Sequence, residues 1–284
     1  MHFLSLARLS EYQIERIFVL ADKLIIHDYV RALSGKTFLL FFPESSLRTR
    51  ITFEKGIKQL GGDCIVFPPE ALDKKENARD MIGYIENWAD GLIVRHPDFS
   101  KIEELAAYAS IPVINAMTSS DHPCEILSDL YAIRKIRTNY RELTYTFVGP
   151  AGNIARSWIE AAKVLDLQFR HVCTNGSAIG GNNRNYTFLV ELEEALQNSD
   201  IVLTDSLPPD KRSADYLDRY QITLKRMKMA NRHALLNPCP PFTRNEEVSD
   251  DAVDSDYFAG YAFKKDLLAV QQAIILYCCG IVCL

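Results

Sequence analysis

The chain has 284 residues, of which 48% are hydrophobic and 24% charged, and its formal net charge is −5. This composition is typical of a globular protein with one large or two ordinary domains, and the negative charge gives no basic footprint for nucleic acid. Seven scattered cysteines without a CxxC pair argue against a disulfide framework or a zinc site and favour a reducing compartment.

Membrane and export patterns are weak in this sequence. The apolar run over 273–284 is shorter than the ~20 residues that cross a bilayer. Charged residues interrupt the first apolar segment, so it does not form a signal-peptide pattern. We therefore expect a cytoplasmic protein with neither a membrane nor a nucleic-acid partner.

Strands and helices alternate through the first half of the chain. An amphipathic helix over 9–26 precedes a short apolar run at 36–42, which reads as a buried strand. Further strands are predicted at 63–67, 91–94 and 111–116, and further helices at 51–60, 78–89, 100–110 and 126–137. Such alternation is typical of a parallel sheet covered by helices on both faces.

The second half restarts the same rhythm after a break at 138–141. Its predicted strands are 143–148, 168–173, 200–204 and 233–236, and its predicted helices are 154–165, 188–197 and a terminal helix from 266. The fold class is therefore α/β, with two similar-sized domains, each a parallel sheet flanked by helices, joined by inter-domain helices. We assign 1–137, completed by 266–284, to one domain and 138–265 to the other.

A strand-to-helix turn carries hydroxyls and arginines in the first half. The sequence Ser46-Leu47-Arg48-Thr49-Arg50 directly precedes the helical stripe. A helix N-terminus offers unpaired N–H groups and a positive dipole end, and arginines add charge-assisted hydrogen bonds, so the turn suits a phosphate dianion. Taken alone, the same pattern also fits a serine cap followed by solvated arginines.

Two more polar features follow strands of the first half. Arg95 ends one strand, and His122-Pro123-Cys124-Glu125 follows the next. Separately they fit a surface arginine and an ordinary helix start. In an open α/β sheet, however, ligands bind beyond the carboxyl ends of the strands. Together with the Ser46 turn they indicate one site for an anionic ligand that carries a carbonyl group.

These motifs resemble the aspartate/ornithine carbamoyltransferase family. The resemblance rests on Ser46–Arg50, Arg95-His96-Pro97 and His122 to Asp129, and it continues in order through 148–153, 203–205, 237–240 and 246–248. It implies that the first domain binds carbamoyl phosphate and the second binds the amine substrate. The amine attacks the carbonyl carbon and phosphate leaves, with no metal ion or cofactor. Gly149 and Gly152 alone do not complete a dinucleotide fingerprint.

The resemblance also assigns roles to single residues. The implied carbamoyl phosphate site consists of Ser46, Leu47, Arg48, Thr49, Arg95, His122, Glu125 and Cys239. Ser46, Arg48 and Thr49 would hold the phosphate, and Arg95, His122 and Thr49 would be the catalytic groups that polarise the carbonyl oxygen. The backbone carbonyl of Cys239, between two prolines, would accept from the carbamoyl NH2.

The family pattern further implies a homotrimer or a multiple of trimers, in which a loop completes the neighbouring subunit's site. The charged segment from Lys74 to Asn77 occupies the matching position. Lys74 or Lys75 is therefore the candidate donor to the neighbour. For either lysine alone, a solvated charged loop is an equally good interpretation.

The acceptor amine follows from two positions of the second domain. Asn153 and Asp205 match the ornithine-type pattern, and an acidic Asp205 suits a cationic substrate better than aspartate. Four positions depart from that pattern: Leu47 offers no hydroxyl, Glu125 stands where glutamine is expected, Asn237-Pro238 replaces histidine-cysteine, and Leu207-Pro208-Pro209 replaces Ser-Met-Gly. We expect carbamoyl transfer to ornithine for arginine biosynthesis; transfer to aspartate or another amine, or a non-catalytic anion-binding paralogue, remain alternatives.

Overall fold

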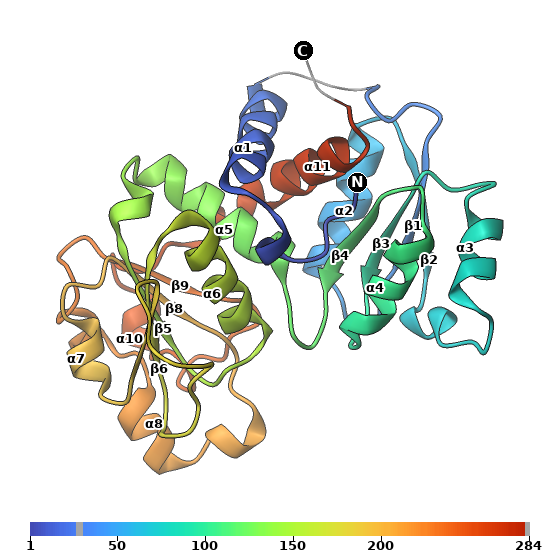
Figure 1. The fold of residues 1–284 in the computed structure, drawn as a ribbon. Coiled ribbons are helices and arrows are strands. Elements are labelled where there is room, and N and C mark those ends of the chain that lie inside the picture. Colours follow the sequence, from blue (N-terminus) through green and yellow to red (C-terminus); the bar gives the residue numbers. More distant parts are fainter. Residues whose placement is uncertain (27–30, 282–284) are drawn as a thin grey trace. The chain divides into compact units, whose positions relative to one another are not determined.

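The structure, a computed structural model, describes residues 1–26 and 31–281. It divides into two compact units, one made of Met1–Ile133 with Lys264–Leu284 and the other of Arg134–Phe263. Each unit contains one all-parallel sheet with helices beside it (Figure 1), which confirms the expected α/β class. Within the described residues, no helix is both long and apolar enough to span a membrane.

The sheet of the first unit has the strand order β2-β1-β3-β4. Its strands are β1 (Thr37–Phe41), β2 (Asp63–Phe67), β3 (Gly91–Arg95) and β4 (Val113–Met117). The helices are α1 (Glu11–Ile26), α2 (Arg48–Gln59), α3 (Ala78–Ile85), α4 (Phe99–Tyr108), α5 (Pro123–Ile136) and α11 (Leu267–Cys278). Short 3-10 turns are η1 (Leu6–Arg8), η2 (Pro69–Leu72) and η5 (Tyr261–Asp266).

Alternating side chains of these strands are buried on opposite faces of the sheet. Phe41, Leu92 and Val94 belong to the apolar cluster that α3 and α4 bury on one face (Figure 1). α2 packs against α11, where Nε2 of the buried Gln272 donates to the carbonyl of Gly56 at 3.0 Å. A Cβ atom at Gly56 would lie 3.0 Å from Cγ of Gln272, so the absence of a side chain permits this close approach.

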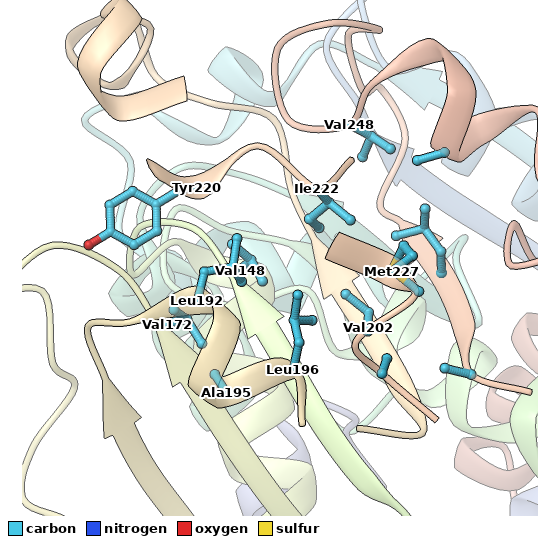
Figure 2. Packing of buried hydrophobic residues seen from close by; sticks show 14 of the residues in the cluster. Val148, Val172, Leu192, Ala195, Leu196, Val202, Tyr220, Ile222, Met227 and Val248 are labelled. Atoms are coloured by element: carbon cyan, nitrogen blue, oxygen red, sulfur yellow. The ribbon is translucent and has the colours of Figure 1, made fainter. Parts of the chain in front are cut away.

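The sheet of the second unit has the order β7-β6-β5-β8-β9. Its strands are β5 (Thr144–Val148), β6 (Gln168–Val172), β7 (Tyr186–Leu189), β8 (Ile201–Thr204) and β9 (Leu235–Pro238). The helices are α6 (Asn153–Leu165), α7 (Leu192–Leu196), α8 (Ala214–Tyr220), α9 (Leu224–Met227) and α10 (Asp250–Val253), with the 3-10 turns η3 (Tyr140–Glu142) and η4 (Pro209–Lys211). Figure 2 shows the core in which Val148, Val172 and Val202 of the sheet meet Leu196 and Met227 of its helices.

One predicted element of the second unit is wrong in part. A helix was expected over 188–197, but Tyr186–Leu189 is strand β7 and the helix α7 covers only Leu192–Leu196. Phe188 and Leu189 pair with His171 and Val172 of β6, and this tertiary pairing overrides the local helical pattern. The short helices α8, α9 and α10 have no counterpart in the predicted elements.

Each sheet has one point at which the chain reverses its direction of winding. In the first unit this point lies between β1 and β3, and in the second between β5 and β8. Connections on the two sides of such a point leave in opposite directions, which opens a crevice at the carboxyl ends of the two strands. The ends of β1 and β3 carry Ser46 and Arg95, and the ends of β5 and β8 carry Asn153 and Asp205.

Candidate functional site

The turn after β1 forms a donor-lined start to α2. The N–H of Ser46 donates to the carbonyl of Pro43 at 2.9 Å, and α2 begins two residues later at Arg48. The first turn of an α-helix has N–H groups outside the helical ladder, so it can bind an anion. Ser46 and Thr49 are buried here, whereas Leu47 is 64% exposed. The residue that lacks the expected hydroxyl therefore faces solvent.

The structure brings Ser46 and Arg95 into direct contact. Nη1 of Arg95, at the end of β3, donates to Oγ of Ser46 at 3.0 Å, although the two residues are 49 positions apart. Burial and the nearby Arg48 guanidinium both lower the pKa of Arg95. Two guanidiniums that repel each other in a half-buried site gain stability from an anion placed between them. This arrangement supports the predicted phosphate site.

His122 adds a neutral imidazole to the same unit. It immediately precedes α5 and is buried. Burial, together with the nearby cations Arg95 and Lys264, lowers the pKa of His122 to about 4, although Glu125 acts in the opposite direction. At neutral pH the ring therefore carries one N–H and no net charge. A neutral donor of this kind can stabilise negative charge that develops on a carbonyl oxygen.

Glu125 has a partner that the sequence did not indicate. Nζ of Lys264 lies 2.7 Å from Oε1 of Glu125 and 2.5 Å from Oδ1 of Asp129. Both carboxylates belong to α5, while Lys264 lies in η5 just before α11. A buried carboxylate requires a cation or several hydrogen-bond donors nearby. An acidic residue at position 125 therefore indicated that a lysine or arginine contacts it, but not which one.

The predicted amine-binding residues lie together in the second unit. Asn153 is the first residue of α6, and Oδ2 of Asp205 is 3.9 Å from the position that a Cβ atom on the preceding Gly152 would take. A cavity of about 380 Å³ is lined by Pro150, Ala151, Gly152, Asp205, Ser206, Leu207 and Pro208. The structure thus brings Asp205 to the turn that carries Asn153.

Side chains from two loops hold the segment that follows Asp205. The buried Glu247 accepts from the N–H of Leu207 and from the N–H of Thr243, both at 2.7 Å. Nη2 of Arg212 donates to the carbonyl of Leu207 at 2.8 Å. These contacts fix the position of the loop where Leu207-Pro208-Pro209 departs from the family pattern. Sequence reasoning assigned no such positioning role to Glu247 and Arg212.

The remaining predicted residues occupy separate places. Cys239 follows β9, and its N–H donates to the carbonyl of Thr204 at 2.8 Å. Lys74 and Lys75 are exposed in the loop after η2. The neighbouring Asp73 accepts from Nε2 of His96 at 3.1 Å, which ties this loop to the end of β3.

A second cavity lies beside α2 in the first unit. Its volume is about 650 Å³, and its lining includes Ser46, Leu47, Ile51 and Lys55 but neither Arg95 nor His122. Volume alone would therefore place a ligand along the outer side of α2. The Arg95–Ser46 contact and the neutral imidazole, in contrast, provide the specific donors of the predicted site.

Comparison with known proteins gives the same family over both units. Residues 1–135 match the carbamoyl-P binding domain of the aspartate/ornithine carbamoyltransferases, and residues 141–278 match the Asp/Orn binding domain. The ornithine carbamoyltransferase of Syntrophotalea carbinolica is 30% identical over 96% of this chain and 97% of its own length. That of Syntrophus aciditrophicus is 32% identical over 86% of each.

Solved structures agree with these sequence matches. The ornithine carbamoyltransferase of Burkholderia thailandensis superposes with a TM-score of 0.87 at 29% identity, covering 97% of both chains. The anabolic ornithine carbamoyltransferase of Campylobacter jejuni gives a TM-score of 0.88 at 25% identity, covering 98% of both chains. With the motifs in order, both units matched and the relatives covered almost end to end, the chain belongs to the aspartate/ornithine carbamoyltransferase family.

Proposed function

We propose that the protein transfers the carbamoyl group of carbamoyl phosphate to the side-chain amine of ornithine, giving citrulline and phosphate. The observation that carries the proposal is the contact between Arg95 and Ser46 at the start of α2. It joins a guanidinium, a hydroxyl and a helix N-terminus at the winding reversal of the first sheet. The relatives named above are ornithine carbamoyltransferases, which supports the same activity here.

In the proposed mechanism the first unit binds and polarises carbamoyl phosphate. Ser46, Arg48 and Thr49 hold the phosphate, and Arg95, Thr49 and the neutral His122 stabilise charge on the carbonyl oxygen. The neutral amine of ornithine attacks the carbonyl carbon, the bond from that carbon to the phosphate oxygen breaks, and the proton lost by the nitrogen passes to the departing phosphate. Catalysis consists of orientation and charge stabilisation, so no covalent enzyme intermediate forms.

The second unit supplies the contacts to the amino acid. Asp205 receives the α-ammonium group and Asn153 receives the α-carboxylate. A carboxylate at Asp205 repels the side-chain carboxylate of aspartate and attracts the cationic ends of ornithine, so ornithine is the favoured acceptor. The backbone carbonyl of Cys239 is retained as an acceptor for the carbamoyl NH2, and this assignment rests on the family resemblance alone.

We also propose that the enzyme works in arginine biosynthesis in the cytoplasm as a homotrimer or a multiple of trimers. The anabolic assignment of the Campylobacter jejuni relative supports the biosynthetic direction. In the trimer, Lys74 or Lys75 would reach the carbamoyl phosphate of the neighbouring subunit. Their exposure in a loop held by the Asp73–His96 contact is compatible with that role.

An acceptor screen tests the proposal. The protein is supplied with carbamoyl phosphate and, separately, ornithine, aspartate, putrescine or lysine, and ureido products and phosphate are measured together. We expect ornithine to have the highest kcat/KM. Higher turnover with aspartate would assign the enzyme to pyrimidine precursors, and binding of carbamoyl phosphate without turnover of any amine would identify a non-catalytic paralogue. The Ser46→Ala/Arg48→Ala variant should lose carbamoyl phosphate binding; unchanged activity would contradict the site assignment.

A further inference from the structure

A buried ion-pair cluster lies next to the proposed carbamoyl phosphate site. Lys264 contacts Glu125 at 2.7 Å and Asp129 at 2.5 Å, and the three side chains are 20%, 8% and 3% exposed, respectively. Glu125 and Asp129 are four residues apart on α5, so they lie on the same face of the helix. Lys264 is 139 positions from Glu125 in the chain. The contact therefore forms only when the C-terminal segment folds back onto the first unit.

The charge of Lys264 decides the ionisation of Glu125. Burial alone would raise the pKa of Glu125, but the positive charges of Lys264 and Arg48 act in the opposite direction, and the pKa falls below its usual range. Without the ammonium group, two carboxylates one helical turn apart would remain in a largely dry environment. Removal of one partner from such a buried pair is strongly unfavourable because it leaves uncompensated charge.

Glu125 lies close in the chain to His122, one of the groups assigned to the carbonyl oxygen. It is three residues from His122 along the chain. Glu125 raises the pKa of His122, while His122 and Arg48 both lower the pKa of Glu125. An ionised carboxylate has two oxygens that only accept hydrogen bonds. Lys264 contacts Oε1, and Oε2 has lone pairs for a donor on a ligand. The carbamoyl NH2 of the substrate is such a donor.

We propose that Lys264 is a positioning residue for carbamoyl phosphate: its ammonium group holds Glu125 as an oriented carboxylate whose second oxygen accepts a hydrogen bond from the carbamoyl NH2. This inference rests on the proposed function and deepens it. Lys264 also cancels one negative charge close to the place where a phosphate dianion binds. A neutral glutamine at position 125 would accept the same hydrogen bond without a counter-ion, so the positioning of residue 125 depends on Lys264 only while that residue is acidic.

A double-mutant cycle tests this dependence. Carbamoyl phosphate binding is measured by calorimetry without an acceptor amine for the full-length protein and for Glu125→Gln, Lys264→Met and Glu125→Gln/Lys264→Met. We expect Lys264→Met to weaken binding by roughly 10- to 100-fold, as for loss of one partner of a buried charge pair. In the Glu125→Gln background the same substitution should lower carbamoyl phosphate affinity by no more than about threefold, since residue 125 no longer needs a counter-ion.

Lys265→Met is the matched control. Lys265 is exposed beside Lys264, so its substitution removes the same charge from the same segment, and affinity should change by less than about twofold. Equal losses from Lys264→Met in both backgrounds would overturn the proposal. If Lys264→Met does not fold, Asp129→Asn is added to all four members of the cycle, so that no unpaired Asp129 carboxylate remains when Lys264 is replaced.

The acceptor assay separates this inference from the function on which it rests. If the unmodified protein carbamoylates ornithine but Lys264→Met weakens binding equally in both backgrounds, only the role of Lys264 is contradicted. If Lys264→Met weakens binding only when Glu125 is present and no amine is turned over, the role of Lys264 is supported and the transferase assignment is contradicted. Failure of the unmodified protein to bind carbamoyl phosphate would overturn both.

Discussion

The two units have the same architecture but form their polar sites differently. In the first, groups at the ends of neighbouring strands contact each other directly, as Arg95 and Ser46 do at 3.0 Å. In the second, Asp205 begins a loop whose position depends on Glu247 from another loop and on Arg212 further along the same loop. Strand ends are fixed by the sheet, whereas loops tolerate substitution. We infer that the first unit recognises carbamoyl phosphate, which all members of the family share as a substrate, and that the loop of the second unit determines the acceptor amine.

The largest effect should come from breaking the first half of this comparison. Arg95→Met removes the guanidinium that contacts Ser46 and, in the proposed mechanism, the carbonyl oxygen. We expect kcat/KM to fall by about 10³-fold or more with every amine tested, as when a charged transition-state contact is lost. Steady-state assays with ornithine and with a slower acceptor provide the comparison.

Arg50→Met is the control for that experiment. Arg50 belongs to the same motif, but its Nε pairs with Oε1 of Glu54 at 2.5 Å on α2. A partly exposed pair one turn apart on a helix contributes little, so activity should stay within about threefold of the unmodified enzyme. Equal losses for the two arginines would mean that general charge, and not the contact with Ser46, sustains the site.

A smaller and more selective effect is expected in the second unit. Asp205→Asn keeps the shape of the side chain but removes the charge that would meet the α-ammonium group of ornithine. We expect KM for ornithine to rise by about 10- to 100-fold while KM for carbamoyl phosphate changes little. Asp210→Asn, an exposed acid further along the same loop, should alter neither constant. A rise in KM for carbamoyl phosphate instead would contradict the inference that the first unit binds carbamoyl phosphate and the second unit binds the acceptor.

The sequence predicted this architecture because most of it is encoded locally. Short apolar runs gave the strands, and β2 has the predicted bounds of 63–67. The positions of Ser46 and Arg95 followed from one rule about strand ends, and the structure brings the two together. Their roles toward a substrate remain predictions until the variants above are assayed.

The parts that were missed depend on distant partners. Residues Tyr186–Leu189 form a strand only because β6 offers an edge to pair with. Lys264 reaches Glu125 across 139 positions, and neither local periodicity nor motif spacing encodes such a contact. The acidic residue at 125 showed only that a cation was required. The fold determines which one supplies it.

The smallest expected effect concerns two buried histidines, one in each unit, which make the free energy of unfolding depend on pH. In the second unit, Nε2 of His171 contacts the carbonyl of Gly149 at 2.8 Å and Nδ1 contacts the hydroxyl of Tyr186 at 3.1 Å, while burial lowers its pKa. In the first unit, burial and neighbouring cations lower the pKa of His122 to about 4. Each unfolded histidine binds a proton near pH 6.5, before the folded one does, so stability is complete above that pH and falls as the pH decreases.

The titration of His122 should lower the free energy of unfolding by about 1.4 kcal/mol between pH 7.5 and pH 5.5. The lower pH is one unit below the pKa of an unfolded histidine, and one unit corresponds to this energy. His122→Asn cannot take up this proton, so its free energy of unfolding should fall by that much less over the same interval. Urea unfolding of both proteins at the two pH values measures the difference. If the decline is the same in both, His122 titrates normally in the folded state and would be partly charged near neutral pH. The assignment of His122 as a neutral donor to the carbonyl oxygen would then be wrong, even if the roles proposed for Ser46 and Arg95 are correct.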